Sequence, residues 1–254
     1  GLAAMTAVAT SAGASDVGGS WQTPQATFRA NAEGTLNVLW AAREAGTGRV
    51  LTVGSADVYG KVTAADLPIS EDLALRPVSP YAASKASADH VALQAWLGYD
   101  QQVVRCRPFN HLGPGQTEKF VAPAIAGRVA QNERNGESVV KVGNLSPKRD
   151  FTDVRDVVRA YRLMIERGRA GEVYNVCSGT AIAVQELAEQ FIAMATIPMR
   201  LEPDPDLQRP VDIPVLLGDN SRLVADTGWS PEIPLEDTLR DLLDDRRRRL
   251  AADD

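Results

Sequence analysis

Alternating apolar and mixed segments give the first half of the chain an α/β pattern. Short apolar runs at 49–55 (RVLTVGS) and 101–110 (QQVVRCRPFN) predict buried strands, and the segment from Pro80 to about Trp96 predicts a helix between them. Strands that alternate with helices are typical of βαβ units, which build a parallel sheet. We therefore predict a Rossmann-like, doubly wound α/β fold.

A crossover helix is also predicted upstream. Thr23 is a candidate N-cap, Pro24 suits the first helical position, and Gly46 is a candidate stop. One face of this helix carries three large apolar residues, Leu36, Leu39 and Trp40.

The second half of the chain predicts three more helices. The first spans 153–167 and is closed by Gly168, the second spans 184–195, and the last begins near Pro234. The first of them carries apolar residues at helical spacing that we expect to face a core: Val154, Val157, Val158, Tyr161 and Ile165.

Composition makes the chain an ordinary globular protein, because 44% of its 254 residues are apolar and 24% are charged. A net charge of −6 argues against a nucleic-acid partner, which needs a basic face. Arginines cluster only at 246–249, where the preceding Asp244 and Asp245 allow ion pairs four residues apart with Arg248 and Arg249.

Cys106 and Cys177 lie in strand-like runs, so we expect reduced core cysteines and no zinc site. No apolar run approaches the length of a membrane span, and the start of the chain lacks the pattern of a signal peptide. We expect a cytoplasmic location and no membrane partner.

Tyr81 and Lys85 are the best candidates for chemistry. Ser79 can cap and Pro80 can open a helix that puts Tyr81 in its first turn, with Lys85 one turn later on the same face. An ammonium group and a helix N-terminus favour the phenolate, so we expect a lowered pKa for Tyr81. Ser55 follows a strand at the carboxyl end, where open parallel sheets bind ligands. The alternative is an exposed helix on which Tyr81 is an ordinary aromatic residue and Lys85 a solvated lysine, with Ser55 as the start of an ordinary loop.

Six segments together resemble a known family: GSADVYG, SPYAASK, RPFNHLGPGQ, KVGNLSPKRDFTDVRDVVRAY, VYNVCSG and TGWSPEIPLEDTL. From about Gly18 to the final helix the chain resembles the extended short-chain dehydrogenase/reductases that act on nucleotide sugars. Within that group it is most similar to GDP-4-keto-6-deoxy-D-mannose reductases, with GDP-mannose 4,6-dehydratases as near relatives.

The resemblance implies a catalytic triad of Ser55, Tyr81 and Lys85 and a cofactor that is NADP or NAD. Reduced nicotinamide would give hydride to the C4 keto carbon of a GDP-4-keto-6-deoxy sugar while Tyr81 protonates the forming alkoxide, assisted by Ser55. The product would be of the GDP-rhamnose type. Lys85 would hold the nicotinamide ribose and lower the pKa of Tyr81.

The resemblance also implies two sets of binding residues. The cofactor set is Leu2, Ala3, Ala4, Tyr81, Lys85 and His111. The GDP-sugar set is Asp57, Asn110, Arg149, Arg209 and Asp212. Arginine suits a diphosphate because the guanidinium fork offers paired donors, although surface salt bridging is the ordinary alternative for an arginine. Taken alone, His111 is more often a structural loop histidine.

The implied domain organisation is a cofactor domain of residues 1–110 with parts of 140–180, followed by 111–254 as mostly a smaller nucleotide-sugar-binding lobe. A homodimer through paired helices is expected. No glycine-rich dinucleotide turn occurs between a strand and a helix, so about 60 residues, two β-α units with the first strands, are missing relative to the family. The chain is then either incomplete at its beginning or a truncated relative.

Three functions remain open: the reductase, a dehydratase or other nucleotide-sugar epimerase, and a non-catalytic nucleotide-sugar-binding relic. A GDP-mannose dehydratase is expected to use a glutamate where this chain has Asp57. Aspartate is about 1.5 Å shorter, and a misplacement of about 1 Å can cost about a hundredfold in rate. We therefore predict simple carbonyl reduction.

Overall fold

The computed structural model describes residues 7–10, 13–207 and 213–252, which divide into two compact units. Unit 1 is made of the described residues of three segments, Gly1–Phe109, Val157–Gly179 and Gly218–Ser230. Unit 2 is made of the described residues of the other three segments, Asn110–Asp156, Thr180–Leu217 and Pro231–Asp254.

Unit 1 is built on a four-stranded sheet in the order β1-β2-β3-β7, and every neighbouring pair of strands is parallel. Its strands are β1 (Ala7–Thr10), β2 (Arg49–Val53), β3 (Val103–Pro108) and β7 (Val173–Val176). The α-helices between and after them are α1 (Pro24–Phe28), α2 (Gly34–Glu44), α3 (Pro80–Tyr99), α5 (Val154–Arg167) and α7 (Ser221–Thr227). α5 belongs to unit 1 from Val157 onward. The predicted parallel α/β fold is confirmed.

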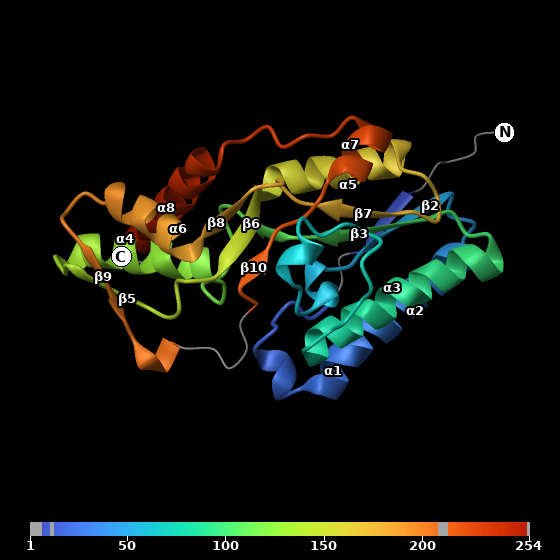
Figure 1. Cartoon of the computed structure of the whole chain (residues 1–254), viewed down its shortest axis with the longest axis horizontal. Coiled ribbons are helices and arrows are strands. Elements are labelled where there is room, and N and C mark those ends of the chain that lie inside the picture. The colour runs from blue at the N-terminus through green and yellow to red at the C-terminus, as the bar shows by residue number, and fades with distance from the viewer. Residues whose placement is uncertain (1–6, 11–12, 208–212, 253–254) are drawn as a thin grey trace. The chain divides into compact units, whose positions relative to one another are not determined.

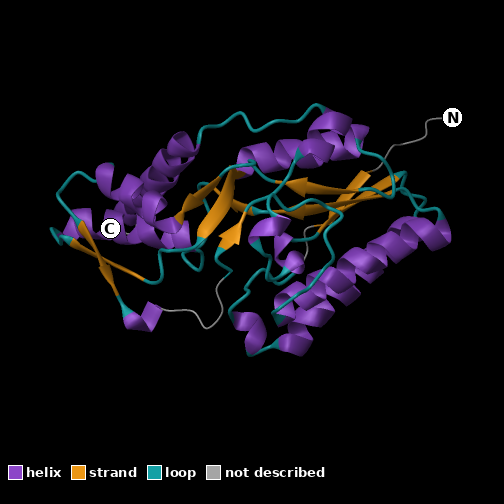
Figure 2. Cartoon of the chain, in the orientation of Figure 1, coloured by secondary structure: helices purple, strands orange, loops and turns teal. Residues whose placement is uncertain are grey.

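Helices cover both faces of this sheet (Figures 1 and 2). Val50 and Val103 pack against α2 and α3, which run side by side on one face. The next residue of each strand, Leu51 or Val104, packs against α5 and α7 on the other face. Because successive side chains of a strand point to opposite faces, a sheet buried on both sides needs continuous apolar strands, as this sequence has.

α3 begins as its sequence predicts. The Ser79 side chain accepts a hydrogen bond of 3.1 Å from the backbone N–H of Ala82, and Pro80 occupies the first helical position. The helix runs to Tyr99, three residues beyond the predicted end, and closes on Asp100 in the left-handed region at φ 54°.

The upstream helix is interrupted, which the sequence pattern did not predict. Between α1 and α2 the backbone forms a π-helical turn, η2 (Arg29–Glu33). Thr23 is the N-cap residue of α1 and Pro24 is its first residue, as predicted, although the Thr23 side chain makes no capping hydrogen bond. Of the three expected face residues only Leu39 is buried, whereas Leu36 and Trp40 are about half exposed.

α5 confirms the helix predicted at 153–167, and the backbone N–H of Gly168 closes it on the Met164 carbonyl. The prediction of the core-facing residues is wrong for one of them, Val158. Val158 is 58% exposed because it lies next to Val157, and two neighbours on a helix point about 100° apart. Val157 takes the buried position.

The hydrophobic core of unit 2 lies between its helices and several short strands, which both contribute buried apolar side chains. The strands β4, β6 and β10 are parallel to one another and β8 runs antiparallel to β6, while β5 and β9 form a separate parallel pair. Their bounds are β4 (Asn110–Leu112), β5 (Val139–Val142), β6 (Lys148–Asp153), β8 (Ala181–Ala183), β9 (Arg200–Pro203) and β10 (Val215–Leu216). The helices are α4 (Val121–Asn135), α6 (Val184–Ala193) and α8 (Leu235–Ala252). Leu187, Phe191 and Leu239 are fully buried at the centre of this core.

Four single turns of 3-10 helix complete the described structure: η1 (Gly19–Trp21), η3 (Ala56–Tyr59), η4 (Ala64–Asp66) and η5 (Pro205–Leu207). Both cysteines are buried and neither forms a disulfide, as predicted. On α8 the Arg249–Asp245 pair forms at 2.8 Å, but Asp244 pairs with Arg247, three residues away, and not with Arg248. Within the described residues, no helix is both long and apolar enough to cross a membrane.

Candidate active site

Ser55 stands just beyond the carboxyl end of β2, at the start of η3. Its side chain accepts a hydrogen bond of 3.2 Å from the backbone N–H of Asp57, which makes it the cap of this turn. Gly54 brings the chain here: its N–H donates to the Cys106 carbonyl at 2.7 Å, and a Cβ would come within 2.8 Å of that oxygen. Only glycine lets the backbone approach β3 so closely before it turns.

Tyr81 lies in the first turn of α3 and is only 8% exposed. Its backbone N–H donates to the Ser20 hydroxyl at 3.2 Å, and its phenol is hydrogen-bonded to Ser55. Burial raises the pKa of Tyr81 to about 12, the Asp57 carboxylate adds to the rise, and the Ser55 hydrogen bond opposes it. The phenol therefore holds its proton firmly at neutral pH.

The lowered tyrosine pKa expected from the sequence is wrong for this structure. The Lys85 ammonium donates a hydrogen bond of 3.1 Å to the Val53 carbonyl at the end of β2, and it is not among the groups that shift the pKa of Tyr81. Burial lowers the pKa of Lys85 itself. Helical spacing put both residues on one side of α3, but burial and the Asp57 carboxylate outweigh any effect of the helix N-terminus on the phenol.

Asn31 was not predicted as a site residue from the sequence; it lies in the π-helical turn and is 1% exposed. Its amide donates to the Ser84 hydroxyl at 2.8 Å and to the Ala14 carbonyl at 3.2 Å. Its Oδ1 is buried and has no hydrogen-bond partner among the described residues. A buried acceptor of this kind, on a π-turn, is typical of a functional site. The only signal in the sequence was a polar side chain inside an otherwise amphipathic helix.

The side chains of Asn31 and Lys85 both lie close to the backbone of Gly13. A Cβ on Gly13, which has φ +157°, would stand 2.1 Å from the Asn31 Oδ1 and 3.7 Å from the Lys85 Nζ. A buried acceptor and a buried three-donor ammonium therefore lie near each other, in the unit that carries Ser55 and Tyr81. Ribose hydroxyls both donate and accept, so these residues fit the ribose of a nicotinamide nucleotide.

Unit 2 carries a second group of the predicted residues. Asn110 and His111 lie on β4, where they pair with Phe151 and Thr152 of β6, and Arg149 lies two residues earlier on β6. The Arg149 guanidinium donates to the Ile213 carbonyl at 2.6 Å.

The His111 carbonyl accepts a hydrogen bond of 3.1 Å from the Gln116 side chain, so the backbone of β4 is tied to the loop that follows it. Five further predicted residues lie outside the described residues: Leu2, Ala3, Ala4, Arg209 and Asp212.

Comparisons with known proteins decide the family. The family model described as GDP-mannose 4,6 dehydratase matches residues 3–242. The chain belongs to this family. This confirms the resemblance to extended short-chain dehydrogenase/reductases of the nucleotide-sugar type and the enzymatic class that it implies.

Two curated relatives illustrate the similarity. The GDP-6-deoxy-D-mannose reductase of Pseudomonas aeruginosa is 38% identical to this chain over 241 residues, which are 94% of this chain and 79% of the reductase. The GDP-mannose 4,6-dehydratase of Sinorhizobium fredii is 29% identical over 240 residues, 86% of this chain and 68% of the dehydratase.

Solved structures agree with the fold. The RMD protein of Pseudomonas aeruginosa complexed with NADPH superposes with a TM-score of 0.91 at 38% identity, covering 96% of this chain and 82% of the other. The UDP-glucose 4-epimerase of Thermus thermophilus in complex with NAD gives a TM-score of 0.84 at 28% identity, covering 95% and 78%. The predicted Rossmann-like fold is thereby confirmed.

Proposed function

We propose that the protein reduces the C4 keto group of a GDP-4-keto-6-deoxy sugar to a hydroxyl, with NADPH or NADH as the reductant. The observation that carries this proposal is the 38% identity to a GDP-6-deoxy-D-mannose reductase over 94% of the chain. The state of Tyr81 supports the same chemistry, since a ketone reduction needs a proton donor beside the carbonyl oxygen.

In the proposed reaction a bound NADPH or NADH supplies the hydride for C4. Tyr81 transfers its phenolic proton to the oxygen that gains negative charge, so one hydride and one proton complete the hydroxyl. Ser55 orients the phenol through their hydrogen bond and stabilises the phenolate left behind. Lys85, fixed on the Val53 carbonyl, and the buried Asn31 are proposed to hold the nicotinamide ribose.

We propose that each of the two units binds mainly one of the two ligands. We assign most of the nicotinamide nucleotide to unit 1 and the GDP-sugar to unit 2, where Asn110 and Arg149 lie on the adjacent strands β4 and β6. His111, the neighbour of Asn110 on β4, stays assigned to the cofactor. Calorimetry with GDP tests the second assignment. An Arg149→Ala variant should bind GDP about tenfold more weakly, the usual scale of a lost charged hydrogen bond. Arg162→Ala, which removes a 68%-exposed side chain from α5, should bind GDP as the native protein does.

Turnover assays distinguish the reductase from the alternatives. We expect oxidation of NADPH or NADH on addition of GDP-4-keto-6-deoxy-D-mannose, and the comparison of the two cofactors decides the preference. Formation of that keto sugar from GDP-mannose would instead support a dehydratase, which the name of the family model favours. Heat of binding with GDP, but none with either reduced cofactor and no turnover, would support a non-catalytic relic.

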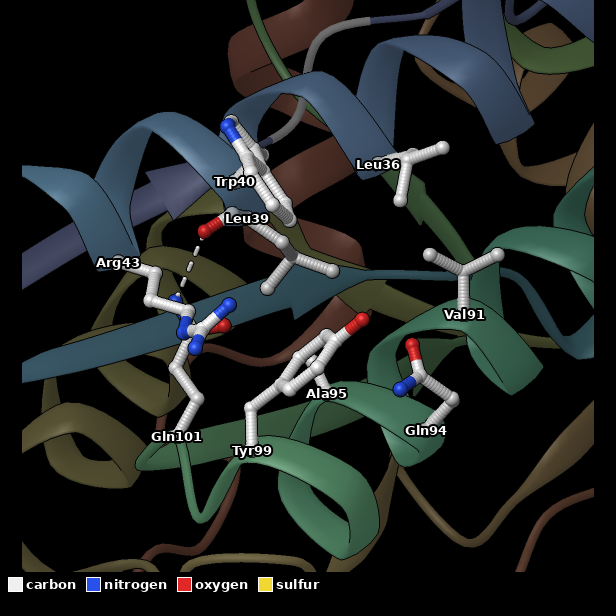
Figure 3. Close-up of a pocket in the computed structure, with 9 residues that line it drawn as sticks. All are labelled: Leu36, Leu39, Trp40, Arg43, Val91, Gln94, Ala95, Tyr99 and Gln101. Carbon is white, nitrogen blue, oxygen red and sulfur yellow. Dashed lines mark hydrogen bonds between the residues drawn. The ribbon is translucent and has the colours of Figure 1, made fainter.

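We propose in addition that two copies associate through α2 and α3. A groove between these helices in unit 1 is lined by Leu36, Trp40, Val91 and Tyr99, with Arg43 between the two aromatic rings (Figure 3). Trp40 is 53% exposed, and arginine and aromatic side chains are enriched at interfaces. A two-fold axis would bring the same face of both copies together.

Light scattering on the whole chain tests this association. A Trp40→Glu variant should have half the mass of the native protein, while Val158→Glu, at an exposed position of α5, should keep the native mass. A monomeric native protein would refute the dimer. The cytoplasmic location stays a prediction from the sequence.

A further inference from the structure

We propose that Arg107 is a positioning residue. It sets the distance between the Ser55 turn, which is η3 with its cap Ser55, and α3, the helix that carries Tyr81 and Lys85. The expected effect on kcat rests on the proposed reductase function. The positioning role itself rests on the contacts of the buried Arg107 guanidinium. Arg107 lies on β3 and is 5% exposed, and it contacts both segments at once.

The first contact ties Arg107 to α3. Its Nε and Nη2 donate to the Oδ2 of Asp89 at 2.8 and 2.5 Å. Asp89 is 5% exposed and lies one helical turn after Lys85. A buried ion pair at this point fixes the height and rotation of α3 on the sheet, and with them the direction of the Lys85 and Tyr81 side chains.

The second contact ties the same guanidinium to the Ser55 turn. Arg107 Nη1 donates to the Tyr59 hydroxyl at 2.9 Å and to the Glu71 carbonyl at 3.1 Å. Tyr59 is 1% exposed and is the last residue of η3, the turn that Ser55 caps. The Tyr59 hydroxyl in turn donates a hydrogen bond of 2.7 Å to the Asn175 Oδ1 on β7.

The resulting chain of contacts runs from Tyr59 through Arg107 to Asp89. It joins the two segments whose side chains meet in the Ser55–Tyr81 hydrogen bond. A buried ion pair adds little stability compared with an apolar replacement, so its value here is geometric. Geometry matters because a shift of about 1 Å can slow a reaction about a hundredfold.

Arg105 offers a matched control two residues earlier on β3. It binds the other oxygen of the same carboxylate, with Nη1 2.8 Å from the Asp89 Oδ1, and it is similarly buried. Its other contact is the Gly171 carbonyl at 3.1 Å, before β7. Arg105 thus secures α3 to the sheet but makes no hydrogen bond to the Ser55 turn among the described contacts.

The test compares Tyr59→Phe, Arg107→Lys and the control Arg105→Lys in steady-state kinetics, with thermal melting measured on each. Tyr59→Phe removes one hydroxyl and keeps the ring, whose centroid lies 5.1 Å from the guanidinium carbon. We expect kcat to fall about tenfold in the first two variants with both KM values nearly unchanged, because the reacting groups and not the binding contacts are displaced. Arg105→Lys should melt earlier, as Arg107→Lys does, but keep a native kcat, because Arg107 still holds Asp89 on α3 and Tyr59 on η3 in that variant.

Amide hydrogen exchange of residues 55–60 supplies a readout that needs no turnover. We expect faster exchange there in Tyr59→Phe and Arg107→Lys, and native exchange in Arg105→Lys. Native exchange in Tyr59→Phe, or equal losses of kcat in the two arginine variants, would overturn the positioning role. A native protein that turns over no keto sugar would overturn the reductase function alone, and the exchange result would still decide the role of Arg107.

Discussion

The raised pKa of Tyr81 makes a quantitative prediction about how reduction depends on pH. A proton donor works only in its protonated form, so the rate follows the protonated fraction of the phenol. With a pKa of about 12, only about one phenol in ten thousand is ionised at pH 8 and about one in a hundred at pH 10. The expected kcat therefore shows no loss from ionisation of Tyr81 between pH 6 and about 10.

Two variants test the cause of this shift. Asp57→Asn removes a charge that raises the pKa of Tyr81, and Ser55→Ala removes a hydrogen bond that lowers it, so their effects on the pKa should be opposite in sign. The assay is the pH profile of kcat, combined with the near-ultraviolet absorbance of tyrosinate in the ligand-free protein. Tyr81→Phe serves as the reference that lacks this phenol.

A pKa near neutrality would give a different profile. The rate would then fall about tenfold for each pH unit above it, and tyrosinate would appear between pH 6 and 8 in the native protein but not in Tyr81→Phe. Either result would refute the claim that burial dominates the titration of Tyr81, and would restore the lowered pKa expected from the sequence.

Three further predictions concern single side chains. Tyr81→Phe should lower kcat by about 10² to 10⁴, the usual contribution of a general acid, while GDP affinity stays native in calorimetry. Gly54→Ala should lower kcat about a hundredfold, because its Cβ would press on the Cys106 carbonyl and displace the turn that follows. Leu187→Ala should cost about 2 to 5 kcal/mol of unfolding free energy in urea, because this fully buried side chain leaves a cavity.

Each of these has its own check. Native turnover in Tyr81→Phe would remove the phenol from the mechanism, and native turnover in Gly54→Ala would mean that β2 and β3 can separate without moving Ser55. For stability the control is Val158→Ala on the exposed side of α5, which should stay within about 0.5 kcal/mol of the native protein. Equal costs for the Leu187 and Val158 variants would contradict the assignment of the core.

Local features of this protein could be predicted from its sequence because they depend on neighbours in the chain. The start of α3 follows from Ser79 and Pro80, whose cap and fixed φ act within one turn. The strands β2 and β3 follow from apolar runs that only a sheet buried on both faces can accommodate. The triad positions came from resemblance to a family, and the comparisons confirm the family.

What the sequence left undecided depends on residues that meet only after folding. Lys85 binds the carbonyl of Val53, 32 residues earlier in the chain, and so does not lower the pKa of Tyr81. Burial of that phenol, the π-turn at Asn31, and the bridge from Asp89 through Arg107 all arise from packing between distant segments. Spacing along a helix fixes which side chains share a face, but only the tertiary fold fixes what that face meets, and therefore its charges and its protons.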